Sequence, residues 1–276
     1  ITQIPRKFFY FAKNRKMNSL KYLALIAIIV GTQGCSKLNL FSIQDDINLG
    51  KQTVQQIASE PAAYPILDPA TNQAAYAYLN AMRDAILTSS EFQHKNDFEW
   101  RLFIIKDDNV QNAFCTPGGY IYVYTGLMKF LDDASSLAGV IGHEMAHADK
   151  RHSTRQMTEQ YGIETLLSFV GGNAQQIASI SAQLISLKFS RNHETESDTY
   201  SVKYLCQTKY RADGAADFFQ KIGSQGVPAF LSTHPDPGDR VENIKKQKTE
   251  LGCGDVDNFT PTEEANSYNQ FKTTLN

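Results

Sequence analysis

The chain has 276 residues, of which 42% are hydrophobic, and this is enough to form a sizeable core in one large domain or two small ones. Its formal net charge is −2, but residues 1–34 contribute six positive charges and no negative one, so the remainder carries −8. Nucleic-acid binding depends on a basic face, and an acidic chain of this kind is therefore a poor candidate for it.

The first 34 residues have the organisation of a secretory signal peptide. A basic start is followed by nine apolar residues, 22–30, and then by small residues before Cys35. Nine apolar residues are too few to cross a bilayer, which takes about 20. We therefore expect a signal peptide over residues 1–34, with Met17 as the true translation start.

Residues 32–35, Thr-Gln-Gly-Cys, resemble the lipobox of bacterial lipoproteins, in which the cysteine is lipidated and becomes the new N-terminus. Gly34 and Cys35 fit the pattern, whereas Leu is usual in place of Thr32 and a smaller residue in place of Gln33. We expect a lipid anchor on Cys35, with plain cleavage or retention of the leader as the alternative.

The remainder is expected to form one mainly helical domain over residues 35–251, because it contains no internal repeat and no Gly/Ser-rich linker. Apolar residues at helical spacing predict helices over 43–59, 71–87, 125–131, 134 into the 150s, 174–188, 194–206, a stretch ending near 222, and 238–251. Residues 252–276 are polar and lack periodicity, which predicts a loosely ordered tail.

Two strands are expected before the 134–150s helix. Residues 98–105 alternate in polarity and are rich in β-forming residues, and a second strand over 120–124 follows a turn at 112–119. A small β-sheet beside a mainly helical framework places the fold in the α+β class.

The second strand carries tyrosines at 120, 122 and 124 on one side, with Ile121 and Val123 on the other. If it is a sheet edge, it holds an extended peptide by strand addition, and the substrate-binding residues are Gly118, Gly119, Tyr120 and Tyr122. An ordinary hairpin with an aromatic face is the alternative.

Three cysteines follow the leader, so at most one disulfide forms among them. Cys206 and Cys253 both fall near the ends of predicted helices and are the expected pair. Cys115 is then a free, buried thiol.

The helix that begins near Ala134 contains His143-Glu144-Met145-Ala146-His147, an H-E-x-x-H pattern. Residues four apart lie one turn apart on the same side of a helix, so both imidazoles face one metal ion, with Glu144 beside them to handle the proton of a metal-bound water. Burying these polar groups is costly unless something binds them. We therefore expect a zinc site; a surface helix with scattered histidines is the alternative.

A catalytic zinc takes a third protein ligand, and the downstream candidates are His152, His193, Glu194, Glu196 and His234. Glu194 and Asp198 are one helical turn apart, so Glu194 is placed to bind zinc while Asp198 accepts the second ring N–H of a ligand histidine. Glu196 lies about 200° round the helix from Glu194 and cannot share its site. A solvated acidic face is the alternative for this stretch.

These residues carry a family resemblance. The H-E-x-x-H motif followed by Ser190-Arg191, Glu194 and Asp198 resembles the zinc peptidases related to the CAAX prenyl protease, the HtpX heat-shock protease and the BepA quality-control protease. The similarity runs from about Asn112 to Lys245 and includes a late His-Pro loop. It implies a gluzincin-type metalloprotease domain with one Zn²⁺ bound by His143, His147 and Glu194, and with Glu144 as the catalytic base.

The resemblance also suggests a gating role for His234. This residue is expected to act as a latch and fourth zinc ligand, or as a hydrogen-bond donor to the oxyanion. Arg240 is expected to steady the same loop or the developing charge, with a surface salt bridge as the alternative. His152 is expected to be a solvated residue at a helix end, and no role is expected for His94 or His193.

Two functions from different classes follow. The first is a zinc endopeptidase of the bacterial cell envelope, an outer-membrane lipoprotein facing the periplasm, that hydrolyses unfolded or misassembled envelope proteins. The second is a non-hydrolytic periplasmic chaperone or assembly factor using the same cleft. An intact Glu144 favours the first, since a holding chaperone needs no general base.

Overall fold

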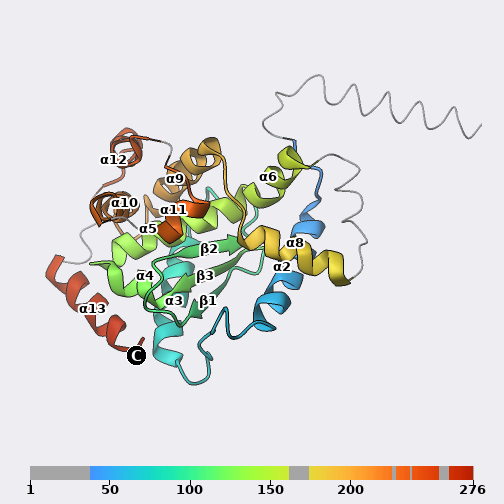
Figure 1. Ribbon diagram of the computed structural model, residues 1–276. Coiled ribbons are helices and arrows are strands. Elements are labelled where there is room, and N and C mark those ends of the chain that lie inside the picture. Colours follow the sequence, from blue (N-terminus) through green and yellow to red (C-terminus); the bar gives the residue numbers. More distant parts are fainter. Residues whose placement is uncertain (1–37, 162–173, 226–227, 237, 255–260, 276) are drawn as a thin grey trace, which may run out of the picture. The chain divides into compact units, whose positions relative to one another are not determined.

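The structure is a computed structural model that describes residues 38–161, 174–225, 228–236, 238–254 and 261–275 (Figure 1). Contacts divide the chain into residues 1–39 and 40–276, and every element discussed below belongs to the second unit. The expected signal peptide and Cys35 lie outside the described residues. Within the described part of the chain, none of the helices has the length and apolar character needed to cross a bilayer.

A three-stranded sheet forms the centre of the second unit. Strands β1 (Arg101–Ile105), β2 (Ala113–Thr116) and β3 (Tyr120–Tyr124) lie in the order β1-β3-β2, with β3 parallel to β1 and antiparallel to β2. Strand β2 occupies part of the expected turn at 112–119. The α+β architecture, mainly helical with a small sheet, is confirmed.

The two faces of the sheet are buried against different helices. Ile121 and Val123 pack into the main core with helices α3 (Gln73–Ile86) and α5 (Ala134–Asp149). On the opposite face, Tyr120 and Tyr122 pack with Phe103, Phe114 and residues of α2 (Ile43–Ala58) and α8 (Ala174–Ile185). The expected alternation of side chains along this strand is therefore present, and both faces of the sheet are buried.

Strand β3, which was expected to lie at a sheet edge, is the middle strand of the sheet. Both sides of β3 are hydrogen-bonded, and Tyr120 and Tyr122 are 2% and 0% exposed. A Cβ on Gly118 or Gly119 would meet protein atoms at 3.1 to 3.4 Å, so neither glycine borders open space. The proposal that Gly118, Gly119, Tyr120 and Tyr122 hold a substrate strand is wrong on this geometry, and the alternative hairpin with an aromatic face describes β2 and β3.

Helix α5 is the buried centre of the helical part. All of its residues are buried, and Asp133 caps its N-terminus by accepting a hydrogen bond from the Ser136 backbone N–H. It packs against α9 (Arg191–Leu205) and α10 (Gly214–Gln225). The approach to α10 requires glycine: a Cβ on Gly139 would lie 2.1 Å from the backbone nitrogen of Ala215.

The expected continuation of α5 into the 150s is wrong. The helix stops at Asp149, Arg151 has a left-handed backbone with φ of 58°, and α6 (His152–Gln160) begins as a separate helix. The Arg151 side chain is anchored at this break, with Nε 2.5 Å from Oδ2 of Asp46 and Nη2 2.6 Å from the Phe41 carbonyl oxygen.

The remaining helices are α4 (Thr125–Phe130), α11 (Pro228–Thr233), α12 (Arg240–Glu250) and α13 (Pro261–Thr273). A disulfide joins Cys206, after α9, to Cys253, after α12, and Cys115 is a buried free thiol, as expected. The expectation of a loosely ordered tail is wrong for residues 261–275. Tyr268 and Phe271 of α13, and Leu275 just after it, are buried in the main core.

Candidate metal centre

Two histidine rings of α5 converge inside the protein. His143 and His147 lie one turn apart, are fully buried, and have their Nε2 atoms 3.0 Å apart. Two ring nitrogens at this distance either share a proton or direct their lone pairs at a common cation. Gly139 and Gly142, just before His143, let α10 and α9 approach this part of α5 closely, since a Cβ at these positions would meet Ala215 or Ser201.

A carboxylate from α9 completes the group. Ser190 caps this helix by accepting from the His193 backbone N–H, which sets the first turn so that Glu194 faces α5. Glu194 Oε1 lies 3.3 Å from Nε2 of His147, and Oε2 lies 3.4 Å from Nε2 of His143. Burial raises the pKa of Glu194, but the neighbouring histidines outweigh it and hold this pKa well below its ordinary value.

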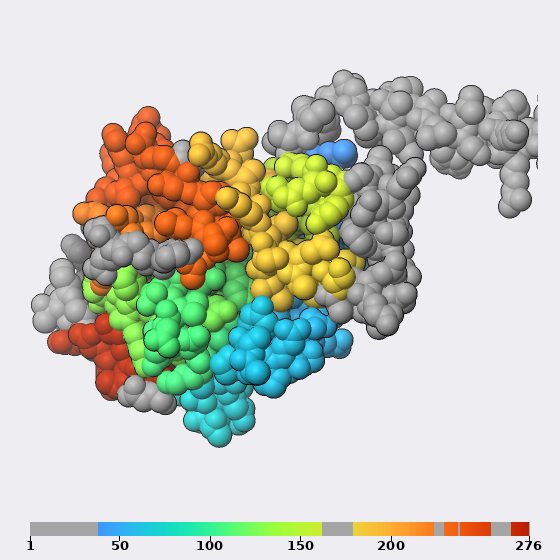
Figure 2. All heavy atoms as spheres, in the orientation of Figure 1, coloured from blue at the N-terminus to red at the C-terminus, as the bar shows by residue number. Residues whose placement is uncertain are grey.

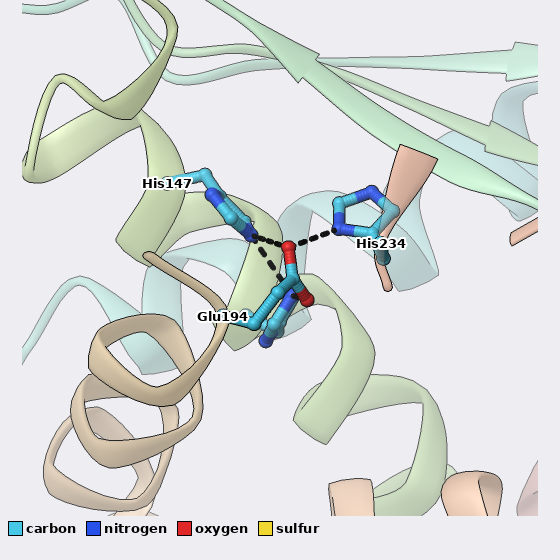
Figure 3. A group of neighbouring side chains, drawn as sticks. His147, Glu194 and His234 are labelled. Carbon is cyan, nitrogen blue, oxygen red and sulfur yellow. Dashed lines mark hydrogen bonds and ion pairs between the residues drawn. The ribbon is translucent and has the colours of Figure 1, made fainter. Parts of the chain in front are cut away.

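His234 approaches from the end of α11. Figure 3 shows its ring and that of His147 on either side of the Glu194 carboxylate. Its Nδ1 is 3.1 Å from Oε1 of Glu194, and its ring stacks on Phe230 with centroids 4.3 Å apart. The four side chains His143, His147, Glu194 and His234 offer ligand atoms that all lie within 4.8 Å of one another.

Glu144 lies beside this cluster and close to the buried thiol of Cys115. Both of its carboxylate oxygens are buried, and neither meets full hydrogen-bonding geometry with a described residue. The Nε2 of His234 lies 3.6 Å from Oε1 of Glu144. Burial raises the pKa of Glu144, and the nearby histidines only partly oppose this. A buried carboxylate with a raised pKa and no fixed partner is suited to exchanging a proton.

Asp198 and Arg240 lie on the Nδ1 side of the His143 ring. The Nδ1 of His143 lies 2.9 Å from Oδ1 of Asp198. This is the position expected for Asp198 from its spacing of one helical turn from Glu194. Burial lowers the pKa of His143, but the hydrogen bonds to Asp198 and Glu194 outweigh it and raise this pKa to about 9. Arg240 binds both carboxylates, with Nη2 2.6 Å from Asp198 Oδ1 and 3.1 Å from Glu194 Oε2. Since Arg240 is 4% exposed, the alternative of a surface salt bridge is wrong.

The expectation that His152 is a solvated residue at a helix end is also wrong. His152 is fully buried, its Nδ1 lies 2.9 Å from Nδ1 of His147, and its Nε2 lies 3.0 Å from Oε2 of Glu196. Burial lowers the pKa of His152 to about 4, whereas hydrogen bonding to His152 lowers that of Glu196 to about 2. His193 stacks on the His152 ring, and His94 pairs with Asp97 away from the cluster.

The donor set fits a zinc ion. Histidine nitrogen and glutamate oxygen are common zinc ligands, and catalytic sites use three protein ligands with a further position left for water or substrate. In the described part of the chain, Nε2 of His234 and both Glu144 oxygens are buried without a partner in hydrogen-bonding geometry. Such groups are costly to bury unless a ligand satisfies them.

Comparison with known proteins places these residues in a family. Residues 73–248 match the model of peptidase family M48. The chain is 33% identical over 147 residues to the mitochondrial metalloendopeptidase OMA1 of Arabidopsis thaliana, covering 51% of this chain and 30% of that protein. It is 28% identical over 203 residues to a putative beta-barrel assembly-enhancing protease of Vibrio cholerae, covering 66% and 40%.

A third relative is the beta-barrel assembly-enhancing protease of Escherichia coli K12, 25% identical over 239 residues, with 79% of this chain and 47% of the relative covered. The chain spans less than half the length of these three proteins. The family match covers well over half of the chain and includes every residue of the cluster described above. The chain belongs to peptidase family M48.

Proposed function

We propose that this protein is a zinc-dependent endopeptidase that hydrolyses peptide bonds of unfolded or misassembled cell-envelope proteins. The observation that carries the proposal is the convergence of His143, His147 and Glu194 beside the unpartnered carboxylate of Glu144. Membership of peptidase family M48 supports the same reaction class.

One zinc ion per chain would be held by His143, His147 and Glu194. A bound zinc ion lowers the pKa of a coordinated water to about 7 and polarises the carbonyl group to be attacked. Asp198 accepts the Nδ1–H of His143, which fixes that ring with its Nε2 lone pair toward the cluster. Arg240 holds Asp198 and Glu194 in place by pairing with both carboxylates.

Glu144 is the general base. Its free carboxylate takes a proton from the attacking water and then delivers it to the nitrogen of the leaving amine. The absence of a fixed hydrogen bond in the described structure leaves both oxygens able to accept this proton. General acid–base catalysis of this kind contributes roughly 10² to 10⁴ to the rate.

His234 acts as a latch that keeps the site closed. It lies between Glu144 and Glu194 and is fully buried, so it occupies space that a scissile peptide needs. In Figure 2 part of the orange surface of the α10–α12 region borders the green atoms of the sheet region directly. Opening requires His234 and its short helix to move, after which the ring is available to hydrogen-bond the oxyanion.

The proposed location is the periplasmic side of a bacterial outer membrane. The names of two relatives describe proteases that enhance beta-barrel assembly, and this supports envelope proteins as the substrate class. The lipobox-like segment before Cys35 supports a lipid anchor to the membrane. Mass spectrometry of the membrane fraction would find a diacylglycerol on Cys35, and an unmodified Cys35 would contradict the anchor.

Hydrolysis of unfolded casein by the purified protein, with and without a chelator, tests the function. The wild type is expected to cleave casein in a chelator-sensitive manner, and Glu144→Gln is expected to retain zinc and lose cleavage. If neither the wild type nor His234→Ala cleaves casein, the non-hydrolytic chaperone becomes the better account.

A further inference from the structure

The ring of His147 has a hydrogen-bonding partner behind the metal-binding cluster. Its Nε2 faces the cluster, whereas its Nδ1 lies 2.9 Å from Nδ1 of the buried His152. The other nitrogen of His152 lies 3.0 Å from Oε2 of Glu196. His147, His152 and Glu196 thus form a hydrogen-bonded line that leads from the cluster to a half-buried carboxylate.

The direction of these hydrogen bonds follows from the partners of Glu196, the residue of the line that lies farthest from the cluster. Oε2 of Glu196 also accepts from Nη1 of Arg155 at 3.0 Å, and a carboxylate paired with arginine is an acceptor. The His152 Nε2 that faces it therefore donates. A neutral imidazole carries one N–H, so Nδ1 of His152 accepts.

The same rule then fixes His147. Since Nδ1 of His152 accepts, Nδ1 of His147 must carry the proton, and its Nε2 presents a lone pair toward His143 and Glu194. The opposite tautomer would place an N–H in the centre of the cluster, where it would exclude a cation. Ser197 Oγ, 3.1 Å from Nδ1 of His152, supplies a second donor to the same acceptor.

The helix break after α5 brings His152 to this position. On an uninterrupted helix, a residue five places after His147 would lie about 140° round from it. The left-handed backbone of Arg151 ends α5 and turns the first residue of α6 back toward the cluster. Two stacking contacts fix the orientation of these rings. The ring centroids of Phe189 and His147 are 4.0 Å apart, and those of His193 and His152 are 4.3 Å apart.

We propose that His152 and Glu196 are positioning residues that fix the tautomer and orientation of His147 so that its Nε2 lone pair is available to the metal. They do for His147 what Asp198 does for His143, with an imidazole inserted between the ligand and the carboxylate. The inference rests on the proposed function only in taking zinc as the bound ion.

The first test observes the protons directly. Long-range ¹⁵N–¹H correlation spectra of the zinc-loaded wild type are expected to show His147 protonated at Nδ1 and His152 protonated at Nε2. A His152 protonated at Nδ1, alone or on both nitrogens, would overturn the inference. This measurement uses the wild type and does not depend on whether any variant folds.

The second test measures zinc affinity by competition with a chromogenic chelator. His152→Phe keeps an aromatic ring but removes the acceptor, and is expected to raise the Kd for zinc by roughly 10- to 100-fold, as loss of such partners does elsewhere. His152→Asn keeps an oxygen near the position of Nδ1 and is expected to recover most of that loss. Glu196→Gln weakens the hydrogen bond that His152 Nε2 donates to this side chain, and it is expected to raise the Kd for zinc by up to about tenfold.

Matched controls separate this effect from general damage. Thr195→Val changes an exposed neighbour of Glu196 whose hydroxyl bonds only within its own helix, and it is expected to leave the zinc Kd unchanged. A folded His152→Phe with the wild-type Kd would contradict the inference while leaving the proposed function intact. A wild type with no measurable zinc affinity would instead contradict the proposed function.

Discussion

His234 lies with Nδ1 3.1 Å from Oε1 of Glu194, on the side of that carboxylate opposite to the ring of His147 (Figure 3). The same imidazole reaches toward Glu144 with its other nitrogen. One side chain, just after the end of α11, therefore lies between the proposed base and a proposed ligand.

His234→Ala is expected to increase casein hydrolysis at saturating zinc. A hydrogen bond to a charged group stabilises a closed arrangement by about 1.5 kcal/mol, so its loss raises the open population by about tenfold. The initial rate of casein cleavage measures this, with His94→Ala as the control, because the His94 ring pairs with Asp97 away from the cluster. A fall to the rate of Glu144→Gln would show that His234 is not a latch.

Arg240→Met is expected to destabilise the zinc-free protein strongly. The substitution leaves two buried carboxylates, Asp198 and Glu194, without their cation, and breaking a buried pair in this way costs about 3 to 5 kcal/mol. Lys246→Met in the same helix removes only an exposed pair with Glu250 and is expected to cost less than about 0.5 kcal/mol. The free energy of unfolding in urea compares them, and equal losses would refute the structural role assigned to Arg240.

The stability of the zinc-free protein is expected to fall as the pH is lowered from about 6.5 to 4. Burial lowers the folded-state pKa of His152 to about 4, below the ordinary value of 6.5, so the folded state resists its protonation. The associated stability is present above pH 6.5 and is lost progressively toward pH 4, with a size of up to about 3 kcal/mol. Glu196, with its pKa lowered to about 2, adds a loss only below about pH 4.5.

Urea unfolding of the wild type and His152→Phe between pH 7.5 and 4.5 measures this effect. The free-energy difference between the two proteins is expected to shrink as the pH falls. A difference that stays constant over this range would show that folding does not lower the pKa of His152.

Gly139→Ala and Gly223→Ala are expected to change stability in opposite directions. A Cβ at Gly139 would lie 2.1 Å from the backbone of Ala215, so α5 and α10 must separate at a cost of about 1 to 3 kcal/mol. A Cβ at Gly223 meets no atom within 4 Å, and alanine in a helix is favoured over glycine by about 0.5 to 1 kcal/mol. Thermal denaturation distinguishes the two variants, and a stabilised Gly139→Ala would contradict the close packing of α5.

Local periodicity predicted the part of the site that lies on two helices. Both histidines of α5 and the pair Glu194 and Asp198 on α9 are spaced by one turn, and the structure brings these two faces together. The mainly helical fold, the small sheet and the Cys206–Cys253 disulfide could also be predicted from the sequence.

The remaining features depend on tertiary contacts that no local pattern reports. The role of His152 depends on the left-handed Arg151, whose side chain is held by Asp46 about a hundred residues earlier in the chain. The middle position of β3 depends on parallel pairing with β1, which periodicity cannot assign. The only sequence signal for His152 was its position five residues after His147.

Glu194 and the two histidines of α5 are proposed to bind one zinc ion. Metal analysis of the wild type beside Glu194→Ala, both purified in the presence of equimolar zinc, tests it most directly. One zinc ion per chain is expected in the wild type, and at least a 100-fold weaker affinity is expected in the variant, roughly at or above the largest loss caused by removing a partner of a ligand. Equal zinc content and affinity in the two proteins would contradict it.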